Sequence, residues 1–463
     1  MKKNIKHIHF IGIGGTGMNG LAEIFLNMGY KISGSDINSS ENTERIRKLG
    51  GKIFIGHNEK NIENADIVVY SNAISDTNPE ILSAKKMKIP VIPRAAMLNE
   101  VLRFKTGIAI AGSHGKTTTT SMVAHIFESA KKRPTYIVGG VVKTGGRHAK
   151  AGKGKYVIVE ACEAYGSFLY LNPVIVAITN IDNDHLDYYK NMDNLKEAFK
   201  NFVNKIPFYG IVYLNGDDIN IKSISNDILR KKVFFGFNKE NDIFAYNIKI
   251  KGFTQSFDVV YNKKKLGRFE LEIPGRHNIL NALVAIAISY DVGIKVNKIK
   301  KSLRNFKNVK RRFNIHNISG YTVIEDYAHH PSEIKKVLIT GREISRKNQR
   351  IITIFQPHLF TRTQLLYKDF AKALSLSDFV ILDKIYPARE VPIPSVSSKL
   401  IYDYMKELKF NNVFYFTDWS EIIAKLKDIV TKKDIICVLG AGNIIEILDL
   451  MKKELKWRNL SIV

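Results

Sequence analysis

Short apolar segments recur along the first hundred residues in a pattern typical of parallel α/β proteins. β-Branched segments at 7–14, 31–36, 52–56, 66–71 and 90–93 are separated by mixed polar and apolar stretches of helical length. Such alternation predicts strands that are joined by helices and that form a largely parallel sheet. The sequence therefore predicts a first α/β domain over residues 1–106.

The same pattern predicts two further domains, at 107–308 and 309–463. In the second we expect strands at 107–112, 155–160 and 174–179, and alternating segments between 243 and 273 that look antiparallel. In the third we expect five strands, at 321–326, 350–356, 378–383, 412–416 and 434–442. Each domain is thus expected to have a largely parallel sheet with flanking helices.

The composition is that of a folded protein with several domains. The 463 residues are 45% apolar and 25% charged. No apolar run approaches the roughly 20 residues that cross a bilayer. The only cysteines, Cys162 and Cys437, give no disulfide framework, which is typical of a reducing compartment. We therefore expect a cytoplasmic protein without membrane insertion.

The chain is strongly basic, with 71 Lys and Arg residues against 44 Asp and Glu and a formal net charge of +27. Basic surfaces can neutralise nucleic-acid phosphates. Here the lysines are spread along the whole chain beside many Asn and Ile residues, and the sequence contains no nucleic-acid-binding motif. A general drift of the composition toward Lys, Asn and Ile therefore explains the positive charge as well as nucleic-acid binding does. We expect no specific nucleic-acid partner, and we expect anionic small-molecule substrates.

A glycine-rich turn, Gly12-Ile13-Gly14-Gly15-Thr16-Gly17, follows the first predicted strand. Glycines allow backbone N–H groups to approach a pyrophosphate at the start of a helix. Asp36 ends the second predicted strand, where an acid can bond a ribose hydroxyl. The turn predicts a nucleotide site. It leaves open a nicotinamide oxidoreductase, or a tight turn that only packs a helix on the sheet.

A second loop gives a more specific signal. Between an apolar strand and a threonine-rich helix the sequence reads Gly112-Ser113-His114-Gly115-Lys116-Thr117-Thr118. Backbone N–H groups of such a loop cradle phosphates, the lysine reaches the terminal phosphates, and the next hydroxyl ligates Mg²⁺. Ile110 stands where the usual phosphate-loop pattern has glycine. The alternative is a helix cap that merely contains Lys116.

Both loops resemble motifs of the Mur ligases, and further segments follow in that family's order. They are Thr179-Asn180-Ile181, Asp184-His185, Gly275-Arg276-His277-Asn278 with Asn281, Arg311-Arg312-Phe313, Asp326-Tyr327-Ala328-His329-His330-Pro331, Phe355-Gln356-Pro357-His358, Tyr386-Pro387-Ala388 and Gly440-Ala441-Gly442-Asn443. The resemblance covers nearly the whole chain. It implies a Rossmann-like N-terminal domain, a phosphate-loop ATPase-like central domain and a Rossmann-like C-terminal domain.

The resemblance also implies roles for individual residues. UDP-sugar binding is implied for Gly12, Gly14, Gly15, Thr16, Gly17, Asp36 and Ser71. ATP binding is implied for Gly112, Ser113, His114, Gly115, Lys116, Thr117, Thr118, Asn278, Asn281, Arg312 and Asp326. Mg²⁺ binding is implied for Thr117, Glu160 and His185, and amino-acid binding for Tyr327, His329 and Arg362. Catalytic roles are implied for Lys116, Glu160, His185, Arg312 and Asp326.

Several of these residues have simpler alternatives. Glu160 could cap a loop, and His185 could be a histidine with satisfied hydrogen bonds at a strand end. Asn278 and Asn281 could be a helix cap and a polar helix face. Arg312 lies in a basic segment whose default interpretation is a solvated linker.

Within the family, the segments DYAHHP and FQPH point to the member that adds L-alanine. The resemblance then implies ATP-dependent joining of L-alanine to UDP-N-acetylmuramate through an acyl phosphate, with Mg²⁺. The alternatives are a murein-peptide ligase of the same family, which attaches a ready-made peptide, and a phosphate-loop ATPase that couples hydrolysis to motion.

Four positions depart from the family pattern. Cys162 and Tyr165 stand where acids are common, Leu359 where arginine is common, and Arg389 where glycine is frequent. We therefore expect the support of the metal to differ, and one cation of the site to lie elsewhere.

Overall fold

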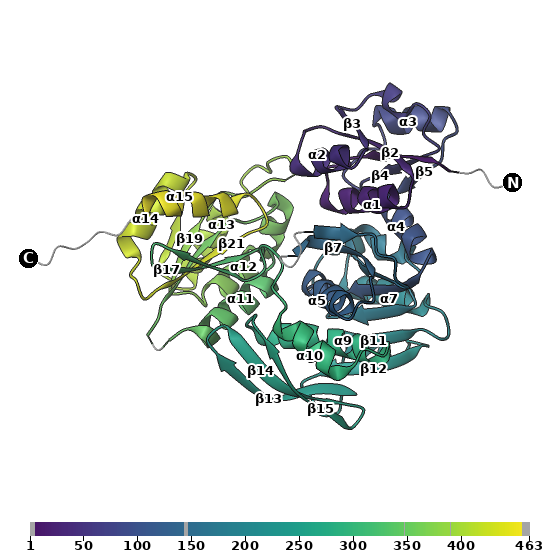
Figure 1. Ribbon diagram of the computed structural model, residues 1–463. Helices are drawn as coiled ribbons and strands as arrows, with labels where there is room; N and C mark the ends of the chain where they lie inside the picture. Colours follow the sequence, from purple (N-terminus) through teal and green to yellow (C-terminus); the bar gives the residue numbers. More distant parts are fainter. Residues whose placement is uncertain (1–4, 143–146, 347, 389, 456–463) are drawn as a thin grey trace, which may run out of the picture. The chain divides into compact units, whose positions relative to one another are not determined.

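Three sheets with flanking helices form the protein, as the computed structural model shows (Figure 1). The structure describes residues 5–142, 147–346, 348–388 and 390–455. Each sheet is built largely from parallel strands, which confirms the predicted fold class. Among the described residues, no helix is long and apolar enough to cross a membrane.

The chain divides into two compact units by its internal contacts. The first consists of Met1–Ile248, Phe257–Glu270 and Ile279–Val309, and the second of Lys249–Ser256, Leu271–Asn278 and Lys310–Val463. The first unit contains the first sheet and most of the second, and the third sheet lies in the second unit. The three domain ranges drawn from the sequence stay a prediction.

The first sheet has the strand order β3-β2-β1-β4-β5, with every pair parallel. Its strands are β1 (His7–Ile11), β2 (Lys31–Asp36), β3 (Lys52–Ile55), β4 (Ile67–Tyr70) and β5 (Val91–Pro93). Its helices are α1 (Thr16–Asn27), α2 (Glu41–Lys48), η1 (Glu59–Ile62), α3 (Pro79–Lys86) and α4 (Arg94–Arg103). The five predicted strands are all present.

The second sheet has the order β15-β14-β13-β12-β11-β10-β6-β9-β7-β8. Its strands are β6 (Thr106–Ala111), β7 (Thr135–Val142), β8 (Arg147–Lys150), β9 (Tyr156–Glu160), β10 (Ile175–Ile178), β11 (Ile211–Asn215), β12 (Lys231–Gly236), β13 (Ile243–Lys251), β14 (Thr254–Tyr261) and β15 (Lys264–Leu271). Its helices are α5 (Lys116–Ser129), η2 (Ala164–Tyr170), α6 (Leu186–Tyr189), α7 (Met192–Asn204), α8 (Ile219–Ser225), α9 (Arg276–Asp291) and α10 (Val296–Arg304). Two-residue turns join β13, β14 and β15, and such short connections suit the predicted antiparallel pairing.

The third sheet has the order β16-β17-β21-β18-β19-β20. Its strands are β16 (Asn314–Ile318), β17 (Tyr321–Asp326), β18 (Ile351–Phe355), β19 (Phe379–Leu382), β20 (Val413–Tyr415) and β21 (Ile435–Leu439). Its helices are α11 (Pro331–Ile344), α12 (Phe360–Leu374), α13 (Lys399–Glu407), α14 (Trp419–Ile429), η3 (Ile444–Glu446) and α15 (Ile447–Glu454). Only β16 is antiparallel to its neighbour, and the five predicted strands are the five parallel ones.

Two apolar layers cover the third sheet, because alternate side chains of each strand point to opposite faces. On β21, Cys437 and Leu439 belong to a cluster with residues of α11, α12 and α13. Ile436 and Val438 belong to another cluster, with residues of α14 and α15. The helices α11 to α13 therefore lie on one face, and α14 and α15 on the other.

Close packing of β2 against β1 and the turn after it depends on the absence of a side chain at Gly34. A Cβ there would lie 2.6 Å from Phe10 O and 2.6 Å from Ile13 Cδ1. We predict that Gly34→Ala lowers the free energy of unfolding by about 1–3 kcal/mol, since extra volume in a packed core forces neighbours apart. Urea unfolding measures this loss. Gly15→Ala is the control, because its Cβ would lie 3.5 Å from the nearest atom, and an equal loss in both variants would contradict the prediction.

Candidate active site

The loop between β6 and α5 turns sharply enough to point its backbone at one place. Gly112 has φ +124° and Gly115 has φ +84°, a region that favours glycine. A Cβ on Gly112 would lie 2.2 Å from Thr179 Oγ1, so a side chain does not fit there. The loop ends at the N-terminus of α5, where unpaired N–H groups favour an anion.

Lys116 folds back over this loop. Its Nζ donates to Gly112 O at 2.5 Å, to Ser113 O at 3.0 Å, and to Glu163 Oε1 and Oε2 at 3.0 and 2.9 Å. Burial opposes the charge of Lys116, but the Glu163 carboxylate outweighs burial and raises the pKa of the lysine above its usual range. Lys116 is therefore held charged at the mouth of the loop.

Thr117 and Glu160 lie together beside Lys116. The Thr117 hydroxyl donates to Glu160 Oε2 at 3.2 Å, and Gly139 N donates to Glu160 Oε1 at 2.5 Å. A Cβ on Gly139 would lie 2.8 Å from the same carboxylate, so this glycine leaves the space for it. A hydroxyl and a carboxylate side by side are oxygen ligands of the kind that Mg²⁺ prefers.

His185 lies with a different pair of acids. Ligand atoms of Glu163, Asp184 and His185 are all within 4.8 Å of one another. His185 Nε2 is 4.0 Å from Glu163 Oε1 and 3.8 Å from Asp184 Oδ2. Of the three residues expected at the metal, the structure therefore pairs Thr117 with Glu160 and groups His185 with Glu163, which also binds Lys116.

The segment that follows β10 holds the loop between β6 and α5 in place. Asn180 Oδ1 accepts from His114 N at 2.9 Å, and His114 Nε2 lies 3.0 Å from Asp182 Oδ2. Asn281 on α9 approaches from another direction, since a Cβ on Gly115 would lie 2.7 Å from its Oδ1. Asn278, one turn earlier on α9, donates to Pro274 O at 2.6 Å. Ser113, Thr118 and both asparagines are buried.

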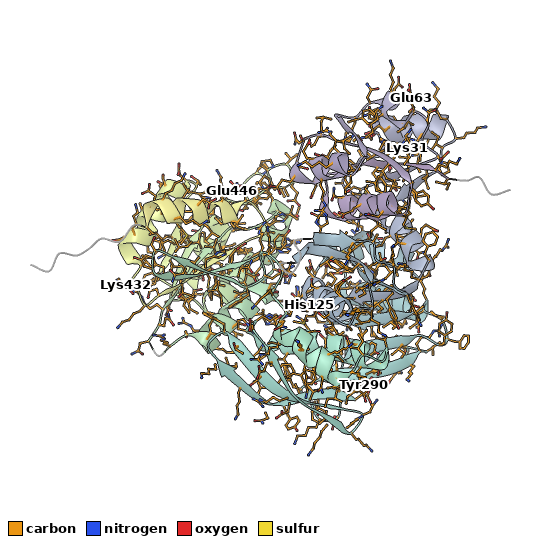
Figure 2. All side chains as sticks on the ribbon, in the orientation of Figure 1. Lys31, Glu63, His125, Tyr290, Lys432 and Glu446 are labelled. Carbon is orange, nitrogen blue, oxygen red and sulfur yellow. The ribbon has the colours of Figure 1, made fainter. Side chains whose placement is uncertain are left out.

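Helix α5, which carries Lys116 and Thr117, is anchored at its middle by His125, labelled in Figure 2. His125 Nε2 lies 3.1 Å from Ser302 O on α10, and its ring meets Phe306 edge-on at 5.7 Å. Burial lowers the pKa of His125, so the ring is neutral and donates to the carbonyl. This contact fixes the direction in which the phosphate loop points.

The N-terminal glycine turn is organised around Asp36. Asp36 Oδ2 accepts from Gly14 N at 2.8 Å, and Gly12 N donates to Ser35 O at 2.8 Å. A Cβ on Gly14 would lie 2.8 Å from Asp36 Oδ2. Gly15 caps α1, and Thr16 and Gly17 form its first turn. Ser71 follows β4 and lies next to the turn: a Cβ built on Gly12 would be 3.4 Å from Ser71 Cβ.

In the second unit, Tyr327 is enclosed by two cations. The guanidinium carbons of Arg311 and Arg312 lie 4.9 and 5.2 Å from the centre of its ring. Arg311 also donates to Gly440 O at 2.7 Å and Gly442 O at 2.9 Å, whereas Arg312 Nη1 lies 3.6 Å from Glu333 Oε1. Cation–π contacts of this kind fix both the ring and the guanidinium groups.

Asp326 ends β17 beneath Tyr327. Its Oδ2 accepts from Phe313 N and its Oδ1 from Ala328 N, both at 2.7 Å. Burial raises the pKa of Asp326 to about 6, although Arg312 and the two N–H groups favour the charged form. The structure thus brings Asp326, Arg312 and Tyr327 together.

His329 and Arg362 reach the same edge of the third sheet. His329 Nδ1 lies 3.0 Å from Tyr327 O and 3.3 Å from Glu333 Oε2, and its ring is 5.9 Å from that of His358. Arg362 lies in the first turn of α12, which begins after Leu359 at the carboxyl end of β18. Tyr327, His329 and Arg362, the residues expected to bind the amino-acid substrate, therefore share the carboxyl edge of one sheet. This is the edge at which α/β proteins bind ligands.

A buried chain of hydrogen bonds supports this edge. Gln356 Nε2 donates to Asp383 Oδ2 at 2.8 Å and to Asn443 Oδ1 at 3.1 Å, and Gln356 Oε1 accepts from Ile444 N at 3.2 Å. Asp383 Oδ2 also accepts from Trp419 Nε1 at 3.0 Å. The chain ties the segments after β18, β19 and β21 to one another.

The sequence analysis did not identify Gly139 or Asp383 as residues that support the site. It also did not predict the ion pair of Glu163 with Lys116. Gly139 lies within an apolar strand segment, and Asp383 simply follows one, so neither forms a recognisable motif. Cys162 lies next to Glu163, and burial raises its pKa, so the thiol is neutral and does not replace an acid. Arg389 lies outside the described residues.

Family models match almost the whole length of the chain. The model of the Mur ligase family, catalytic domain, matches residues 7–106, that of the Mur ligase middle domain 110–289, and that of the Mur ligase, glutamate ligase domain 311–442. The phosphate loop lies in the second match and the Tyr327 site in the third. The chain belongs to the Mur ligase family, and it is an ATP-dependent, amide-bond-forming ligase.

Individual relatives are similar over nearly their full length. A UDP-N-acetylmuramate–L-alanine ligase of a Sulfurihydrogenibium species is 47% identical and covers 97% of this chain and 98% of its own. One from Persephonella marina is 45% identical, over 98% of this chain and 97% of its own. The crystal structure of UDP-N-acetylmuramate–alanine ligase from Thermotoga maritima superposes with a TM-score of 0.80 at 31% identity, covering 96% and 98%.

The raised pKa of Asp326 has a consequence for stability. Its value in the folded protein, about 6, lies above its ordinary value of 3.8. Between these two pH values the folded protein holds a proton that the unfolded chain has released, so the Asp326 contribution to stability falls as pH rises through this window.

We predict that the parent loses stability relative to Asp326→Asn as the pH rises. The difference between their free energies of unfolding, parent minus variant, should fall by about 1–3 kcal/mol from pH 4 to pH 7. Urea unfolding at several pH values measures the difference. Asp428→Asn on α14, where the acid is 68% exposed, is the surface control. A parent–Asp326→Asn difference that is the same at both pH values would contradict the prediction.

Proposed function

We propose that this chain joins L-alanine to UDP-N-acetylmuramate, with conversion of ATP to ADP and phosphate, in the cytoplasmic synthesis of peptidoglycan. The observation that carries the proposal is the set of relatives that carry this enzyme's name and align along nearly their whole length. The excess of basic residues suits two substrates that carry phosphates.

ATP binds at the loop between β6 and α5. Backbone N–H groups from Gly115 to Thr117 face its phosphates, because those of Ser113 and His114 donate to Asn180. Lys116 exchanges part of its contact with Glu163 for the terminal phosphate. A lysine that is already charged and held in place neutralises the transferring group without being reordered during the reaction. The further residues that we propose for ATP binding are Asn278, Asn281, Arg312 and Asp326.

Mg²⁺ is held by Thr117 and Glu160, with His185 as the third proposed ligand. The hydroxyl and the carboxylate are 3.2 Å apart, and they present oxygen atoms, as this ion requires. When bound, the ion neutralises negative charge on the phosphates. Glu163 and Asp184 beside His185 keep that imidazole oriented and add negative charge near the ion.

UDP-N-acetylmuramate binds at the glycine turn of the first sheet. The N-terminus of α1 suits the pyrophosphate, and Asp36 with Ser71 suits the nucleoside. L-Alanine binds at the edge of the third sheet, where Arg362 holds its carboxylate, and Tyr327 and His329 limit the space for its side chain.

The reaction follows from these assignments. The muramate carboxylate attacks the γ-phosphorus of ATP, ADP leaves, and an acyl phosphate forms. The L-alanine ammonium loses a proton, its nitrogen attacks the acyl carbon, and the tetrahedral intermediate expels phosphate to leave an amide. Negative charge builds up on oxygen in both steps, which Lys116 and the loop N–H groups stabilise.

We predict that Lys116→Ala lowers the rate of ADP release by more than about a hundredfold, because the lysine neutralises charge in the transition state. Lys153→Ala, an exposed lysine of the same unit, is the control. Since Lys116→Ala leaves Glu163 buried without its partner, the double variant Lys116→Met/Glu163→Gln is measured as well, with a melting curve for each. A folded variant within tenfold of the parent's rate would sink the assignment of Lys116.

We predict that Arg362→Lys lowers kcat/KM for L-alanine at least about tenfold and leaves the KM for ATP within about twofold, since guanidinium pairs with a carboxylate in a fixed geometry. Steady-state kinetics with each substrate varied measure this, and Arg304→Lys, at an exposed side chain that ends α10, is the control. Glycine and L-serine should be measurable but poorer acceptors. A preference for the tripeptide L-Ala-γ-D-Glu-meso-diaminopimelate would instead identify the peptide-attaching ligase.

A further inference from the structure

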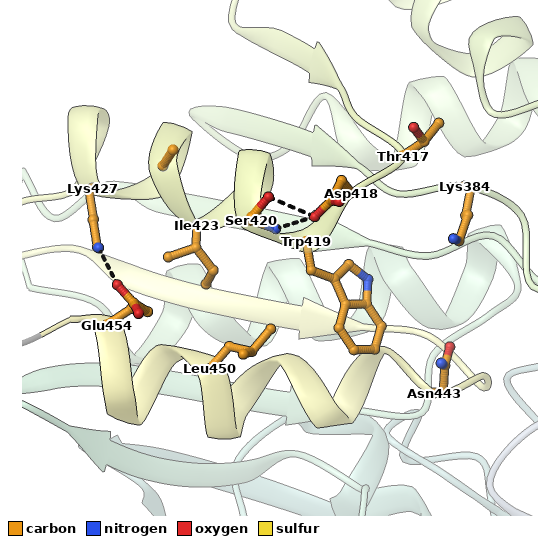
Figure 3. Close-up of a pocket in the computed structure, with 11 residues that line it drawn as sticks. Lys384, Thr417, Asp418, Trp419, Ser420, Ile423, Lys427, Asn443, Leu450 and Glu454 are labelled. Atoms are coloured by element: carbon orange, nitrogen blue, oxygen red, sulfur yellow. Dashed lines mark hydrogen bonds and ion pairs between the residues drawn. The ribbon is translucent and has the colours of Figure 1, made fainter.

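A cavity lies between α14 and α15, on the face of the third sheet opposite to α11, α12 and α13 (Figure 3). Its volume of about 690 Å³ lies within the range of about 300–1,000 Å³ that is usual for small-molecule sites. None of the residues proposed above for UDP-sugar, ATP, metal or L-alanine lines it.

One wall of the cavity is apolar and rigid. Trp419 and Ile423 from α14 and Leu450 from α15 line it. The indole of Trp419 cannot turn freely, because its Nε1 donates to the buried Asp383 at 3.0 Å. A wall that is already ordered loses little entropy when a ligand binds.

The charged groups of the cavity differ between its two ends. At one end Lys427 and Glu454 neutralise each other, with Nζ 2.7 Å from Oε2. At the other end, Lys384 and Asp418 both lie above the indole of Trp419 in the view of Figure 3. Only this second pair is available to a ligand.

Lys384 and Asp418 both keep free binding capacity. No hydrogen-bond or ion-pair partner of the Lys384 ammonium occurs among the described residues. Asp418 uses Oδ1 to accept from Ser420 N and Ser420 Oγ, both at 2.7 Å, which leaves Oδ2. The Ser420 hydrogen bonds and the charge of Lys384 lower the pKa of Asp418, so it stays a carboxylate.

We propose that this cavity binds a free α-amino acid with a large apolar side chain, as a second amino-acid site separate from the one for L-alanine. The ligand's carboxylate meets Lys384, its ammonium meets Asp418, and its side chain lies along Trp419, Ile423 and Leu450. A ligand with a single charge would leave one of the two protein charges without a partner, so the pair selects a zwitterion.

Trp419 itself reports on binding. The sequence has two tryptophans, so Trp457→Phe leaves Trp419 as the only one. Titration of this full-length variant with L-phenylalanine, excited where phenylalanine does not absorb, should give a saturable change in fluorescence. The probes 3-phenylpropionate, which lacks the ammonium, and 2-phenylethylamine, which lacks the carboxylate, should each bind at least fivefold more weakly. Equal binding of all three probes would overturn the selection of a zwitterion.

Two variants and their control test the place of binding. Asp418→Asn removes the charge but keeps a side chain that caps α14 well, and it should weaken L-phenylalanine at least fivefold. Ala424→Phe fills the cavity from α14 and should abolish binding, while Asp428→Asn on the same helix should change nothing. Melting curves show that each variant is folded. Unchanged affinity in both Asp418→Asn and Ala424→Phe would overturn the proposal.

Saturating L-alanine separates this cavity from the proposed catalytic site. L-Phenylalanine should bind equally well with and without L-alanine, and equally well to Arg362→Lys. Competition by L-alanine, or loss of binding in Arg362→Lys, would place L-phenylalanine at the catalytic site and overturn the proposal without affecting the proposed function. No saturable fluorescence change with millimolar L-phenylalanine would overturn it too.

Discussion

The ion pair between Lys116 and Glu163 joins the segments on which the phosphate loop depends. Glu163 is completely buried, and a buried carboxylate without a partner costs several kcal/mol. The pair therefore forces the segment after β9 to lie against the loop after β6, and His185 is brought to the same acid. We propose that ATP phosphates replace part of this contact of Lys116, so that the same ion pair keeps the loop ready for them.

The second unit uses a set of hydrogen bonds, rather than one buried ion pair, for a similar purpose. Gln356 and Asp383 connect the segments that follow three parallel strands, and Arg311 holds the carbonyl groups of Gly440 and Gly442. Each bond is modest, but a chain of buried bonds allows few alternative arrangements. The edge that presents Tyr327, His329 and Arg362 is therefore set by the ends of β17, β18 and β21 together.

Much of the fold follows from local sequence patterns. Strands β18 and β21 are nearly continuous apolar runs, which are typical of strands buried on both faces. β16 was missed because its sequence, Asn-Ile-His-Asn-Ile, is largely polar, and its pairing with β17 is antiparallel at the sheet edge. β7, β11 and β12 were also not identified, since short apolar runs do not by themselves distinguish strands from other buried segments. β8 was missed because its sequence, Arg-His-Ala-Lys, is largely polar.

The candidate site was predictable only where it forms a contiguous motif. Lys116 and Thr117 are recognisable because they are adjacent residues that begin α5 directly after the glycine-containing loop. Glu163 and Gly139 depend on contacts between segments that are not adjacent in sequence, so no spacing reveals them. His185 was expected at the metal with Glu160, whereas the structure groups it with Glu163 and Asp184. Glu163 follows Glu160 by three residues in the segment after β9, and spacing does not show which of the two acids lies nearer to His185.

Transfer of oxygen from substrate to phosphate tests the proposed reaction most directly. UDP-N-acetylmuramate labelled with heavy oxygen in its carboxylate is incubated with the enzyme, ATP, Mg²⁺ and L-alanine, and the released phosphate is analysed by mass spectrometry. We predict that each molecule of phosphate carries one labelled oxygen, because the carboxylate attacks the γ-phosphorus and its oxygen leaves with the phosphate. Unlabelled phosphate, or phosphate release that does not require both UDP-N-acetylmuramate and L-alanine, would contradict the proposed function.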